Sequence, residues 1–442
     1  MDEVNIPRRA KVLVVGSGGR EHAIVDALSR SPRVEKIYCA PGNAGIARQA
    51  KCVPLADTQV DELADFAAQE GIDLTVVGPE VSLAAGIVDE FEARGLKIFG
   101  PSKAAARIES SKDFAKSLMA KYNVPTAAYR TFSDYNEALV YVNAGKLPVV
   151  LKYDGLAAGK GVVVAETYEQ ADEALKDMLL DDKFGHGRVV VEEFLTGPEF
   201  SLLCFVNGSE VEPMELSQDH KRAFDNDEGP NTGGMGAYTP LPFITEKDEV
   251  YALEHIMKPI ASGMVSEGIP FHGVLYGGLM KTPDGIKVIE FNCRFGDPET
   301  EVVLPRLESD IFEIFWAVAN KTPMPLTKWY SDAVIGFVLA SKGYPGSYKK
   351  GFEIRGVDEV MKDPSVKVYH MGTSLKKLDG DGHEAFDKAG HSLVTNGGRV
   401  LMVLASAPTL KEAHDKALAA VEHIDCDNLF HRTDIGHWAF EK

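Results

Sequence analysis

The stretch LPVVLKYDGLAAGKGVVVAE (147–166) joins an apolar run to a β-branched run through a glycine-rich loop. β-Branched residues favour strands, so the stretch predicts strand, loop and strand, with Lys152 near the end of the first strand. It is not a Walker loop, because Gly161 follows Lys160 where Ser or Thr is needed, and no helix comes next. The loop can instead cover a triphosphate, with backbone N–H groups and Lys160 facing the phosphates. A glycine-rich hairpin with solvated lysines is the alternative that this stretch leaves open.

Two later segments add oxygen ligands to this pattern. RVVVEEFLTGPEFSLLCFV (188–206) places acids directly after an apolar strand and another acid, Glu199, after a short link. GIKVIEFNCRFGDPETE (285–301) sets Glu290 and Asn292 two positions apart on a strand, so both point to the same face. Each acid alone is more often a solvated strand residue. Beside a lysine-lined triphosphate site, the pair predicts a magnesium clamp.

The N-terminal hundred residues alternate short β-branched runs with helical patterns, which predicts a parallel α/β sheet. Its first turn, KVLVVGSGGREHA (11–23), lacks the third glycine of a dinucleotide fingerprint and has Glu21 there. The fingerprint's acid after the second strand is also missing, since that strand ends at Ala40 and Pro41. The turn therefore favours one phosphate, on a mononucleotide or a sugar, at the start of a helix. A structural tight turn and a nicotinamide site are the alternatives.

Composition limits the class of protein. The chain has 442 residues, of which 45% are hydrophobic and 26% charged, as expected for a globular protein with several domains. A formal charge of −19 argues against a general nucleic-acid binder. No apolar stretch approaches the roughly 20 residues of a membrane span, so we expect no membrane partner. The five cysteines show no CxxC spacing, which fits reduced thiols and a cytoplasmic location.

Six motifs in order give a resemblance over nearly the whole chain, from about 11 to 440: GSGGREHA, PGNAG, VVGPE, QDHKR, GPNTGGMGAYTP and NCRFGDPET. The chain resembles the ATP-grasp superfamily and, within it, the phosphoribosylamine–glycine ligase family. The resemblance implies an α/β and α+β multidomain fold. Its parts would be an N-terminal parallel α/β domain for the sugar phosphate (1–108), an ATP-grasp domain (109–328) with a mobile flap subdomain at about 124–195, and a small C-terminal α+β domain (329–442).

The resemblance also implies the site residues. ATP as co-substrate would contact Lys112, Lys152, Gly159, Lys160, Gly161, Glu192, Leu195 and Glu199, with adenine near Glu192 and the backbone of Leu195, and ribose near Glu199. Mg²⁺ or Mn²⁺ would bind Glu290 and Asn292. Lys221, Arg294 and Asp297 would be catalytic. The acceptor substrates would contact Gly18, Gly19, Arg20, Glu21, His22, Asn43, Glu80, Asp219, His220, Lys221, Arg222, Gly234, Arg294, Asp297 and Glu299.

The implied reaction is ATP-dependent ligation of glycine to 5-phosphoribosylamine through glycyl phosphate, with release of ADP and phosphate, in purine synthesis. Glycine and the sugar amine would be the partners of a monomer or weak dimer. Another ATP-grasp ligase such as a carboxylase, a nicotinamide-dependent oxidoreductase and a non-enzymatic nucleotide-binding module are the alternatives. Taken singly, His220 and Lys221 fit a polar loop, Asp297 and Glu299 fit a helix cap, and His22 fits a buried hydrogen bond.

Overall fold

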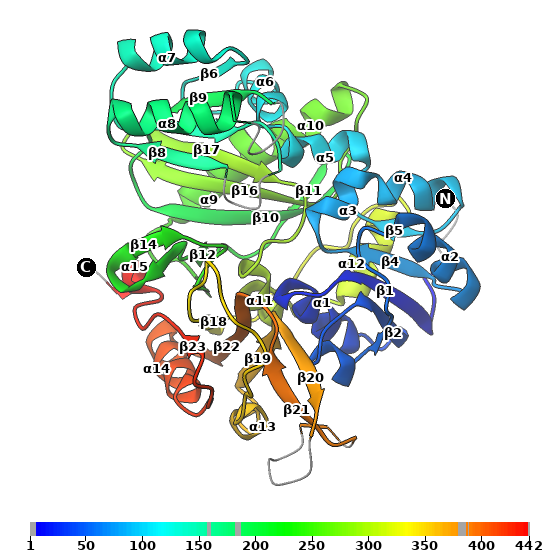
Figure 1. Ribbon diagram of the computed structural model, residues 1–442. Coiled ribbons are helices and arrows are strands. Elements are labelled where there is room, and N and C mark those ends of the chain that lie inside the picture. Colours follow the sequence, from blue (N-terminus) through cyan, green and yellow to red (C-terminus); the bar gives the residue numbers. More distant parts are fainter. Residues whose placement is uncertain (1–5, 157–160, 182–186, 379–385, 388, 441–442) are drawn as a thin grey trace.

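The chain folds into an N-terminal α/β domain, a central domain with two sheets and a C-terminal α+β domain, which confirms the predicted fold class (Figure 1). This computed structural model describes residues 6–156, 161–181, 187–378, 386–387 and 389–440. In that part of the chain, no helix combines the length and the apolarity that crossing a bilayer requires.

The N-terminal domain is a five-stranded parallel sheet in the order β3-β2-β1-β4-β5. β1 carries an uninterrupted apolar run that is buried on both faces, as expected for a parallel strand covered by helices on both sides. The strands are β1 (Ala10–Gly16), β2 (Val34–Pro41), β3 (Lys51–Cys52), β4 (Leu74–Val77) and β5 (Ile98–Phe99). The helices are α1 (Gly19–Ser29), η1 (Ile46–Arg48), α2 (Val60–Glu70), α3 (Glu80–Ala85) and α4 (Ile87–Ala93).

The glycine-rich turn between β1 and α1 is built around Glu21. Its Oε2 accepts a hydrogen bond from the Gly18 N–H at 2.6 Å, and its Oε1 accepts one from Arg20 Nε at 2.6 Å. Gly16 has a φ of +127°, and a Cβ there would lie 2.5 Å from Glu21 Cδ. Glu21 therefore fills the space beneath the turn, and both of its oxygens hold the turn together.

The central domain stacks two antiparallel sheets, β6-β9-β7-β8 and β11-β10-β16-β17. The first contains β6 (Tyr129–Phe132), β7 (Val149–Tyr153), β8 (Val162–Ala165) and β9 (Val189–Glu193), covered by α7 (Tyr135–Ala144) and α8 (Tyr168–Leu179). The second contains β10 (Glu199–Asn207), β11 (Glu210–Pro213), β16 (His272–Thr282) and β17 (Gly285–Asn292), with α9 (Glu246–Ala252), η3 (Leu253–Met257) and α10 (Lys258–Ser266). The helices α5 (Lys103–Ser110) and α6 (Lys112–Lys121) lead in, and α11 (Glu299–Val303), η4 (Leu304–Arg306) and α12 (Ile311–Ala319) lead out.

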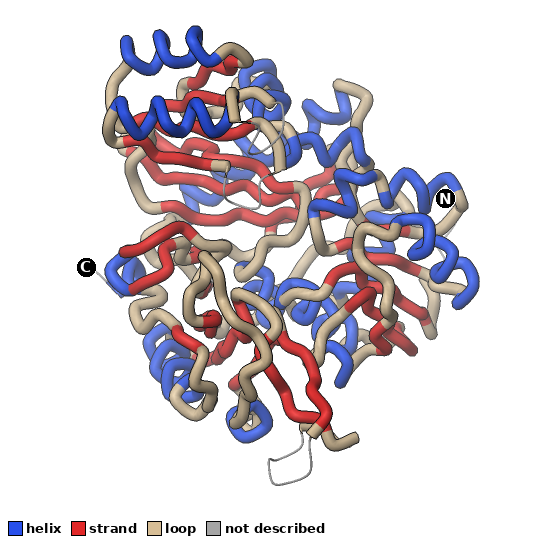
Figure 2. Tube along the Cα trace, in the orientation of Figure 1, coloured by secondary structure: helices blue, strands red, loops and turns tan. Residues whose placement is uncertain are grey.

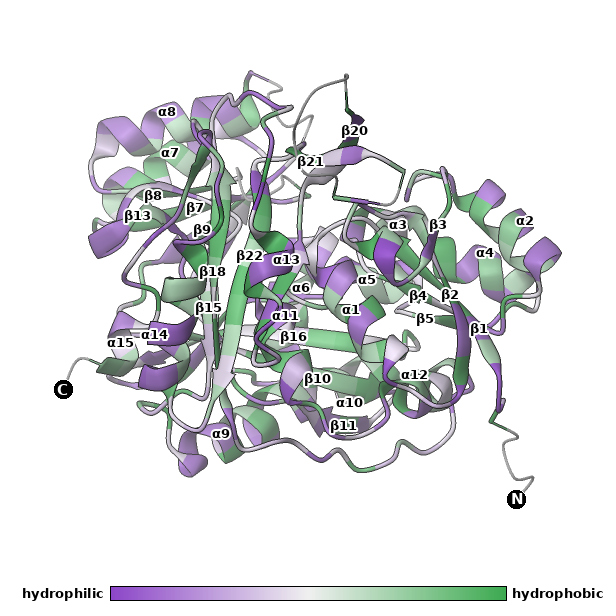
Figure 3. Ribbon diagram, turned by 90° about the horizontal axis from the view of Figure 1, so that it is seen from below, coloured by the Kyte–Doolittle hydropathy of each residue, from purple (hydrophilic) through white to green (hydrophobic). Residues whose placement is uncertain are grey.

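The first of these sheets has a hydrophobic core of its own. Leu151, Val191 and Leu175 belong to a cluster formed by β6–β9 with α7 and α8. The other two clusters run through all three domains, as the apolar interior strands in Figure 3 illustrate. The β6–β9 sheet is therefore a separately packed unit above the rest of the molecule.

The C-terminal sheet has the order β12-β15-β18-β22-β19, and β23 pairs with β18. Figure 2 shows how strands, in red, and helices, in blue, are distributed through the whole molecule. Its strands are β12 (Gln218–Asp219), β15 (Gly236–Thr239), β18 (Ala333–Ser341), β19 (Val366–His370), β22 (Arg399–Ala407) and β23 (Leu429–Phe430). Two hairpins are β13 (Arg222–Phe224) with β14 (Glu228–Asn231), joined by η2 (Asp225–Asp227), and β20 (Thr373–Lys377) with β21 (His391–Thr395). The helices are α13 (Val357–Val360), α14 (Leu410–Val421) and α15 (His437–Phe440). β12 and β15 lie before residue 328 in sequence, so this sheet reaches across the predicted domain boundary.

The N- and C-terminal domains meet at buried polar side chains. The His370 N–H donates to His22 Nδ1 at 2.8 Å, and Asn43 Nδ2 donates to the carbonyl oxygens of His370 and Ser17, both at 2.8 Å. Because burial lowers the pKa of His22 to about 4, its ring is neutral at pH 7 and can accept this hydrogen bond. These contacts hold the first glycine turn against the C-terminal domain.

Candidate functional site

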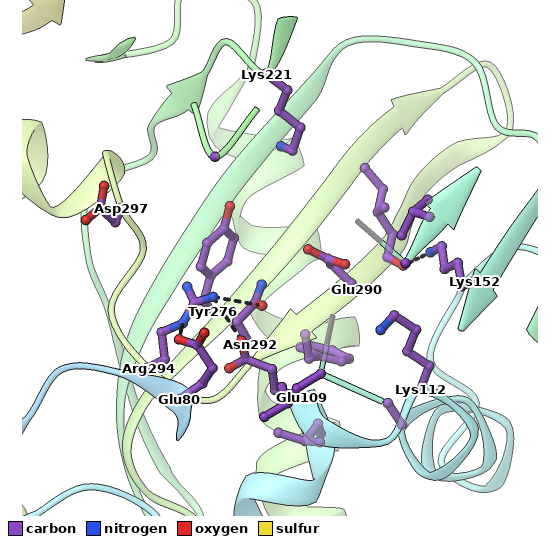
Figure 4. A pocket seen from close by; sticks show the side chains of 18 of the residues that line it. Glu80, Glu109, Lys112, Lys152, Lys221, Tyr276, Glu290, Asn292, Arg294 and Asp297 are labelled. Carbon is purple, nitrogen blue, oxygen red and sulfur yellow. Dashed lines mark hydrogen bonds and ion pairs between the residues drawn. The ribbon is translucent and has the colours of Figure 1, made fainter. Parts of the chain in front are cut away.

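A cleft of about 470 Å³ opens where the three domains meet, and it is termed the main cleft below. The N-terminal domain contributes Arg20 and Glu80, and the C-terminal domain contributes Tyr344 and Arg399. The remaining wall comes from α5, α6, β7–β9, β12, β16, β17, α11 and the loops between them. Figure 4 shows the charged side chains that point into this cleft.

One end of the main cleft, the lysine end, is formed by Lys112, Lys116 and Lys152. Lys112 begins α6, where Ser111 caps the helix, and Lys152 stands on β7. Lys152 Nζ donates to the Ile289 carbonyl at 2.9 Å, and Lys112 Nζ donates to the Gly155 carbonyl at 3.1 Å. Burial lowers the pKa of Lys112, and it lowers the pKa of Lys116 to about 8. Desolvated lysines of this kind attract an anion more strongly than solvated ones.

The Glu192 carboxylate lies between two of these lysines. Lys116 Nζ lies 2.9 Å from Glu192 Oε2, and Lys152 Nζ lies 3.1 Å from Oε1. All three side chains are almost fully buried. The carboxylate thus compensates part of the lysine charge. Leu195, whose backbone is predicted together with Glu192 to contact adenine, is half-buried in the link after β9, and Glu199 follows at the start of β10.

Glu290 and Asn292 point into the main cleft from the same face of β17, and Glu290 lies next to Lys112 and Lys152 (Figure 4). Burial alone would raise the pKa of Glu290, but the charges of Lys152, Lys112 and Lys221 outweigh it and lower that pKa. Glu290 is therefore an ionised carboxylate at neutral pH. A carboxylate and an amide oxygen on one strand face suit a hard divalent cation. In the described ranges, no group of three or more His, Cys, Asp or Glu side chains forms a metal site by itself.

Arg294 sits deeper, enclosed by acids. Its Nη2 lies 2.9 Å from Glu109 Oε1, its Nε lies 3.3 Å from Glu80 Oε2, and its Nη2 also donates weakly to Asn292 Oδ1 at 3.4 Å. Burial would lower the pKa of Arg294, but Glu109 and Glu80 raise it. These contacts fix the guanidinium beside the predicted metal ligand Asn292.

The opposite end of the main cleft carries Asp219, Lys221 and Glu299 around Tyr276. The Tyr276 hydroxyl donates to Glu299 Oε1 at 2.6 Å, and Lys221 Nζ lies 2.9 Å from Asp219 Oδ1. Burial, together with the nearby Asp219 charge, raises the pKa of Glu299. The helix α11 begins at Glu299, and its N-cap position is Pro298, which makes no capping hydrogen bond through its side chain. Asp297 is therefore not the cap of this helix.

A second cavity, of about 320 Å³, adjoins the main cleft and is termed the loop cavity. Its walls are the turns at 17–18 and 42–43 of the N-terminal domain and the turns at 371–373 and 396–399 of the C-terminal domain. Asp297 and Arg399 line both cavities, and Arg399 Nη1 lies 2.9 Å from Asp297 Oδ1. The two residues therefore lie where the two cavities adjoin.

The structure brings most of the predicted residues together. The main cleft is lined by Arg20, Glu80, Lys112, Lys152, Gly161, Glu192, Asp219, Lys221, Glu290, Asn292, Arg294, Asp297 and Glu299, and the loop cavity by Gly18, Asn43 and Asp297. Neither cavity is lined by Gly19, Glu21, His22, Leu195, Glu199, His220, Arg222 or Gly234. Gly159 and Lys160 lie outside the described residues.

Local structure explains why several residues of that second group do not line either cavity. Glu21 accepts hydrogen bonds within the turn between β1 and α1, and His22 accepts one at the junction of the N- and C-terminal domains. His220 is buried, and its Nε2 accepts a hydrogen bond from the Gly436 N–H at 2.8 Å. Gly234 has a φ of +114°, and a Cβ there would lie 2.5 Å from Pro298 Cδ. Gly234 therefore serves the close packing of its loop against the cis Asp297–Pro298 bond.

The sequence reasoning did not single out Lys116, Glu109, Tyr276, Tyr344 or Arg399, which also line the main cleft. One local signal existed for Lys116, because it follows Lys112 by four positions and so lies on the same helix face. Glu109, on the preceding helix, and Arg399, over a hundred residues after Asp297, carry no comparable local signal.

The chain matches three family models over most of its length. Residues 10–109 match the phosphoribosylglycinamide synthetase N domain, residues 110–300 its ATP-grasp (A) domain, and residues 334–438 its C domain. The phosphoribosylamine–glycine ligase of Halalkalibacterium halodurans is 50% identical over 427 residues, which cover 96% of each chain. That of Listeria innocua is 50% identical over 428 residues, covering 96% of this chain and 99% of its relative. The crystal structure of the Thermotoga maritima phosphoribosylamine–glycine ligase superposes with a TM-score of 0.82 at 30% identity, covering 96% of this chain and all of the other.

Proposed function

This chain belongs to the phosphoribosylglycinamide synthetase family and is an ATP-dependent ligase that joins glycine to 5-phosphoribosylamine in purine biosynthesis; we propose that the reaction proceeds through an enzyme-bound glycyl phosphate. A carboxylate oxygen is a poor leaving group, so amide formation needs a phosphorylated carboxyl. The observation that carries the proposal is the main cleft, where two candidate oxygen ligands on β17 lie near the buried lysines Lys116 and Lys152 and the half-buried Lys112.

The ATP phosphates bind at the lysine end in this proposal. Lys112 and Lys152 supply fixed positive charge, and Lys116 joins them through Glu192. Gly161 lines the cleft at the end of the glycine-rich loop and permits close approach of the backbone to phosphate. The predicted partners Gly159 and Lys160 belong to the same loop, and adenine and ribose extend toward Leu195 and Glu199.

A divalent cation fits the residues of β17. Glu290 would provide an ionised carboxylate and Asn292 an amide oxygen, and triphosphate oxygens would complete the coordination, as is usual for Mg²⁺. The bound cation, Mg²⁺ or Mn²⁺, would neutralise charge on the transferring phosphoryl group. The charges of the surrounding lysines lower the pKa of Glu290 and so keep its carboxylate ionised, as a cation ligand must be.

The bond changes follow from this arrangement. A glycine carboxylate oxygen attacks the γ-phosphorus, the bond to ADP breaks, and glycyl phosphate remains in the cleft. The sugar amine then attacks the acyl carbon and loses a proton, and phosphate leaves with the former carboxylate oxygen. Arg294 and Lys221 place positive charge near the acyl phosphate, and Asp297 orients the amine.

The proposal also covers the domain boundaries, the mobile flap, the oligomeric state and the cellular compartment. We place the domain boundaries after residues 108 and 328, which the ends of the matched N and A domain models, at 109 and 300, support in part. The separate core of the β6–β9 sheet supports motion of this unit as a flap over ATP. A monomer or weak dimer in the cytoplasm completes the proposal, and the free thiols of the five cysteines agree with that compartment.

Oxygen transfer tests the intermediate. Glycine labelled with heavy oxygen in its carboxylate should yield phosphate carrying one labelled oxygen per turnover, measured by mass spectrometry of the released phosphate. If the nucleotide activates the sugar amine instead, the label stays in the amide or in water. Unlabelled phosphate from an active enzyme would contradict glycyl phosphate.

A companion assay isolates the ligase activity itself. ADP release is measured with glycine, phosphoribosylamine or ATP omitted in turn. Full ADP release should require all three, and release that ignores glycine and the sugar amine would contradict the ligase assignment while leaving nucleotide binding intact.

A further inference from the structure

The loop at 219–236, termed the hairpin loop below, forms part of the main cleft wall with its base. The residues of this loop that line the cleft are Asp219, Lys221, Thr232 and Gly233. The Thr232 N–H and hydroxyl both donate to the Lys221 carbonyl, at 2.7 and 2.8 Å, and so close the base of the hairpin formed by β13 and β14. The tip of the hairpin, η2, is not part of the cleft wall. Any contact at the tip therefore acts on the cleft through the hairpin.

The tip of the hairpin loop holds two consecutive residues with side chains in the left-handed region of the backbone. Asn226 has a φ of +62° and Asp227 has a φ of +53°. Asn and Asp adopt this backbone more readily than other residues, but two in succession persist only where surrounding contacts hold them. The backbone of the tip therefore indicates contacts from outside the hairpin.

Arg432, in the segment that follows β23, makes those contacts. Its side chain is fully buried, and its Nη1 donates to Asp227 Oδ1 at 2.9 Å and to the Arg222 carbonyl at 3.1 Å. Its Nε and Nη2 donate to the two carboxylate oxygens of Asp434, at 2.7 and 2.9 Å. Asp434 Oδ2 also accepts the Asn226 N–H at 2.8 Å. One guanidinium thus holds both left-handed residues, Asp227 directly and Asn226 through Asp434.

Further hydrogen bonds join the C-terminal segment, residues 432–437, to the hairpin loop. The Thr433 N–H and hydroxyl donate to the Asp225 carboxylate at 2.8 and 2.6 Å. The Gly436 N–H donates to His220 Nε2 at the base of the loop. Figure 1 shows the hairpin, in green, beside α15 at the red end of the chain. The C-terminal segment therefore holds the hairpin loop at its tip and at its base.

The two carboxylates around Arg432 are charged. Hydrogen bonding with His220 and Arg432 lowers the pKa of Asp227. Burial alone would raise the pKa of Asp434, but the hydrogen bonds from Arg432 outweigh it and lower that pKa to about 2. Charge-assisted bonds to a guanidinium are strong, and its planar fork fixes their direction. The network therefore sets the position of the tip relative to the C-terminal segment.

We propose that Arg432 is a positioning residue for the ligase reaction, which places Lys221 in the main cleft by holding the hairpin loop. The Lys221 side chain is 45% exposed, and its Nζ lies 2.9 Å from Asp219 Oδ1 and 3.4 Å from Glu199 Oε2. A lysine stem is flexible, so the backbone of the loop decides where this ammonium group can reach. The inference rests on the ligase function proposed above, in which Lys221 places positive charge near the acyl phosphate.

A double-variant cycle tests whether Arg432 acts through Lys221. Arg432→Lys keeps a charge but loses the fork, and it should lower kcat about 10- to 100-fold, because a misplacement of about 1 Å is enough for such a loss. Lys221→Gln should lower kcat about 100-fold. The double variant should be slower than Lys221→Gln by no more than about twofold, since both changes remove the same contribution. Two independent effects would multiply instead.

Two further measurements separate positioning from a folding defect. The KM for ATP should stay within about twofold in Arg432→Lys, because the lysine end stands on other elements. Hydrogen exchange, followed by mass spectrometry, should be faster in peptides covering 219–233 and unchanged in peptides covering β17. Arg94→Lys is the matched control, an exposed arginine that pairs with three carboxylates of the N-terminal domain, and it should keep wild-type kcat and exchange.

Asp227→Asn tests the same network if Arg432→Lys does not fold. The substitution keeps the size of an exposed side chain at the tip but removes one charged partner of Arg432. It should lower kcat about 3- to 10-fold, with the same faster exchange of the hairpin loop and the same lack of additivity with Lys221→Gln.

The outcomes distinguish this inference from the ligase function. Wild-type kcat in Asp227→Asn and Arg432→Lys, wild-type kcat in Lys221→Gln, or effects that multiply in the double variant would each overturn the positioning role. A wild-type enzyme whose ADP release ignores glycine and phosphoribosylamine would overturn the ligase function instead. In that case, faster exchange of 219–233 in both variants would still show that Arg432 holds the hairpin loop.

Discussion

The lysine end of the main cleft and the loop cavity are both suited to phosphate, but they are built by different means. At the lysine end, the charge is carried by side chains of one domain, the buried Lys116 and Lys152 and the half-buried Lys112. In the loop cavity, glycine turns from two domains supply backbone, and Arg399 supplies a single cation. A triphosphate demands several positive charges, whereas a phosphate monoester needs few charges and close-fitting donors.

The lysine end and the loop cavity therefore need different neighbouring residues. Buried lysines need nearby carboxylates, because an unpaired charge in a low-dielectric site is costly. Glu192 and Glu290 meet that need. The loop cavity needs close backbone packing instead, so glycines stand where side chains would collide. Substitutions in the two regions should therefore weaken different substrates.

The strongest test of this separation is Glu290→Ala. Removing the carboxylate that faces the lysines should lower kcat about 10²- to 10³-fold at saturating Mg²⁺. The affinity for ribose 5-phosphate should not change, because the loop cavity does not contain Glu290. Steady-state ADP release and calorimetry measure the two quantities.

Asp284→Ala, at the exposed turn that precedes β17, is the matched control and should keep wild-type turnover. Near-wild-type ADP formation by Glu290→Ala would remove this residue from the metal site. Equal loss of ribose 5-phosphate affinity would show that the two regions do not act separately.

A smaller effect is expected from Gly161→Val. A valine side chain there would obstruct the approach of the loop backbone to phosphate and should raise the KM for ATP about 10- to 100-fold, with a much smaller change for glycine. Initial-rate kinetics with each substrate varied in turn measure both constants.

Gly145→Val provides the control in the same subdomain. Gly145 has an extended backbone, and a Cβ there would meet only carbonyl oxygens at 3.4 Å or more, so valine fits. If Gly161→Val weakened ATP and glycine equally, general misfolding would explain the result better than a phosphate-binding loop.

The smallest effect concerns the junction of the N- and C-terminal domains, where His22 accepts the His370 N–H. His22 has a folded pKa of about 4 against about 6.5 when unfolded, so the unfolded state takes up more protons below pH 6.5. Stability should therefore fall as the pH drops from 6.5 toward 4, by about 2 kcal/mol between pH 7.5 and pH 5 from this residue.

His22→Gln keeps an acceptor for the His370 N–H but does not titrate, so its urea midpoint should drop less between pH 7.5 and pH 5 than that of the wild type. His255→Gln, at an exposed position, should behave like the wild type. An identical pH dependence in His22→Gln and the wild type would mean that His22 is not the buried neutral group described above.

The sequence supported the parts of the site that depend on local periodicity. Glu290 and Asn292 share a face because side chains alternate along a strand, and the structure places both in the main cleft. The strand, glycine turn and helix of the N-terminal domain followed from an apolar run and its glycines. The sequence also excluded the dinucleotide fingerprint through Glu21, which the structure shows folded beneath the turn.

The orientation of single side chains was harder to predict. Glu21, His22 and His220 belong to motifs of the family and were expected at the substrate. The structure gives them partners in the turn, at the domain junction and in the C-terminal segment. A motif places a residue near a site, but packing against residues distant in sequence decides which way its side chain points.

The sequence by itself therefore determined the fold class, the family and the strand that carries Glu290 and Asn292. Only the tertiary structure decided that β12 and β15 join the C-terminal sheet, and that Arg399 meets Asp297. It also shifts the pKa of Lys116 downward and that of Glu301 upward, since these depend on burial and on neighbouring charges. The physical reason is range: alternation and propensity act between residues a few positions apart, whereas burial and charge pairing act between any residues that packing brings together.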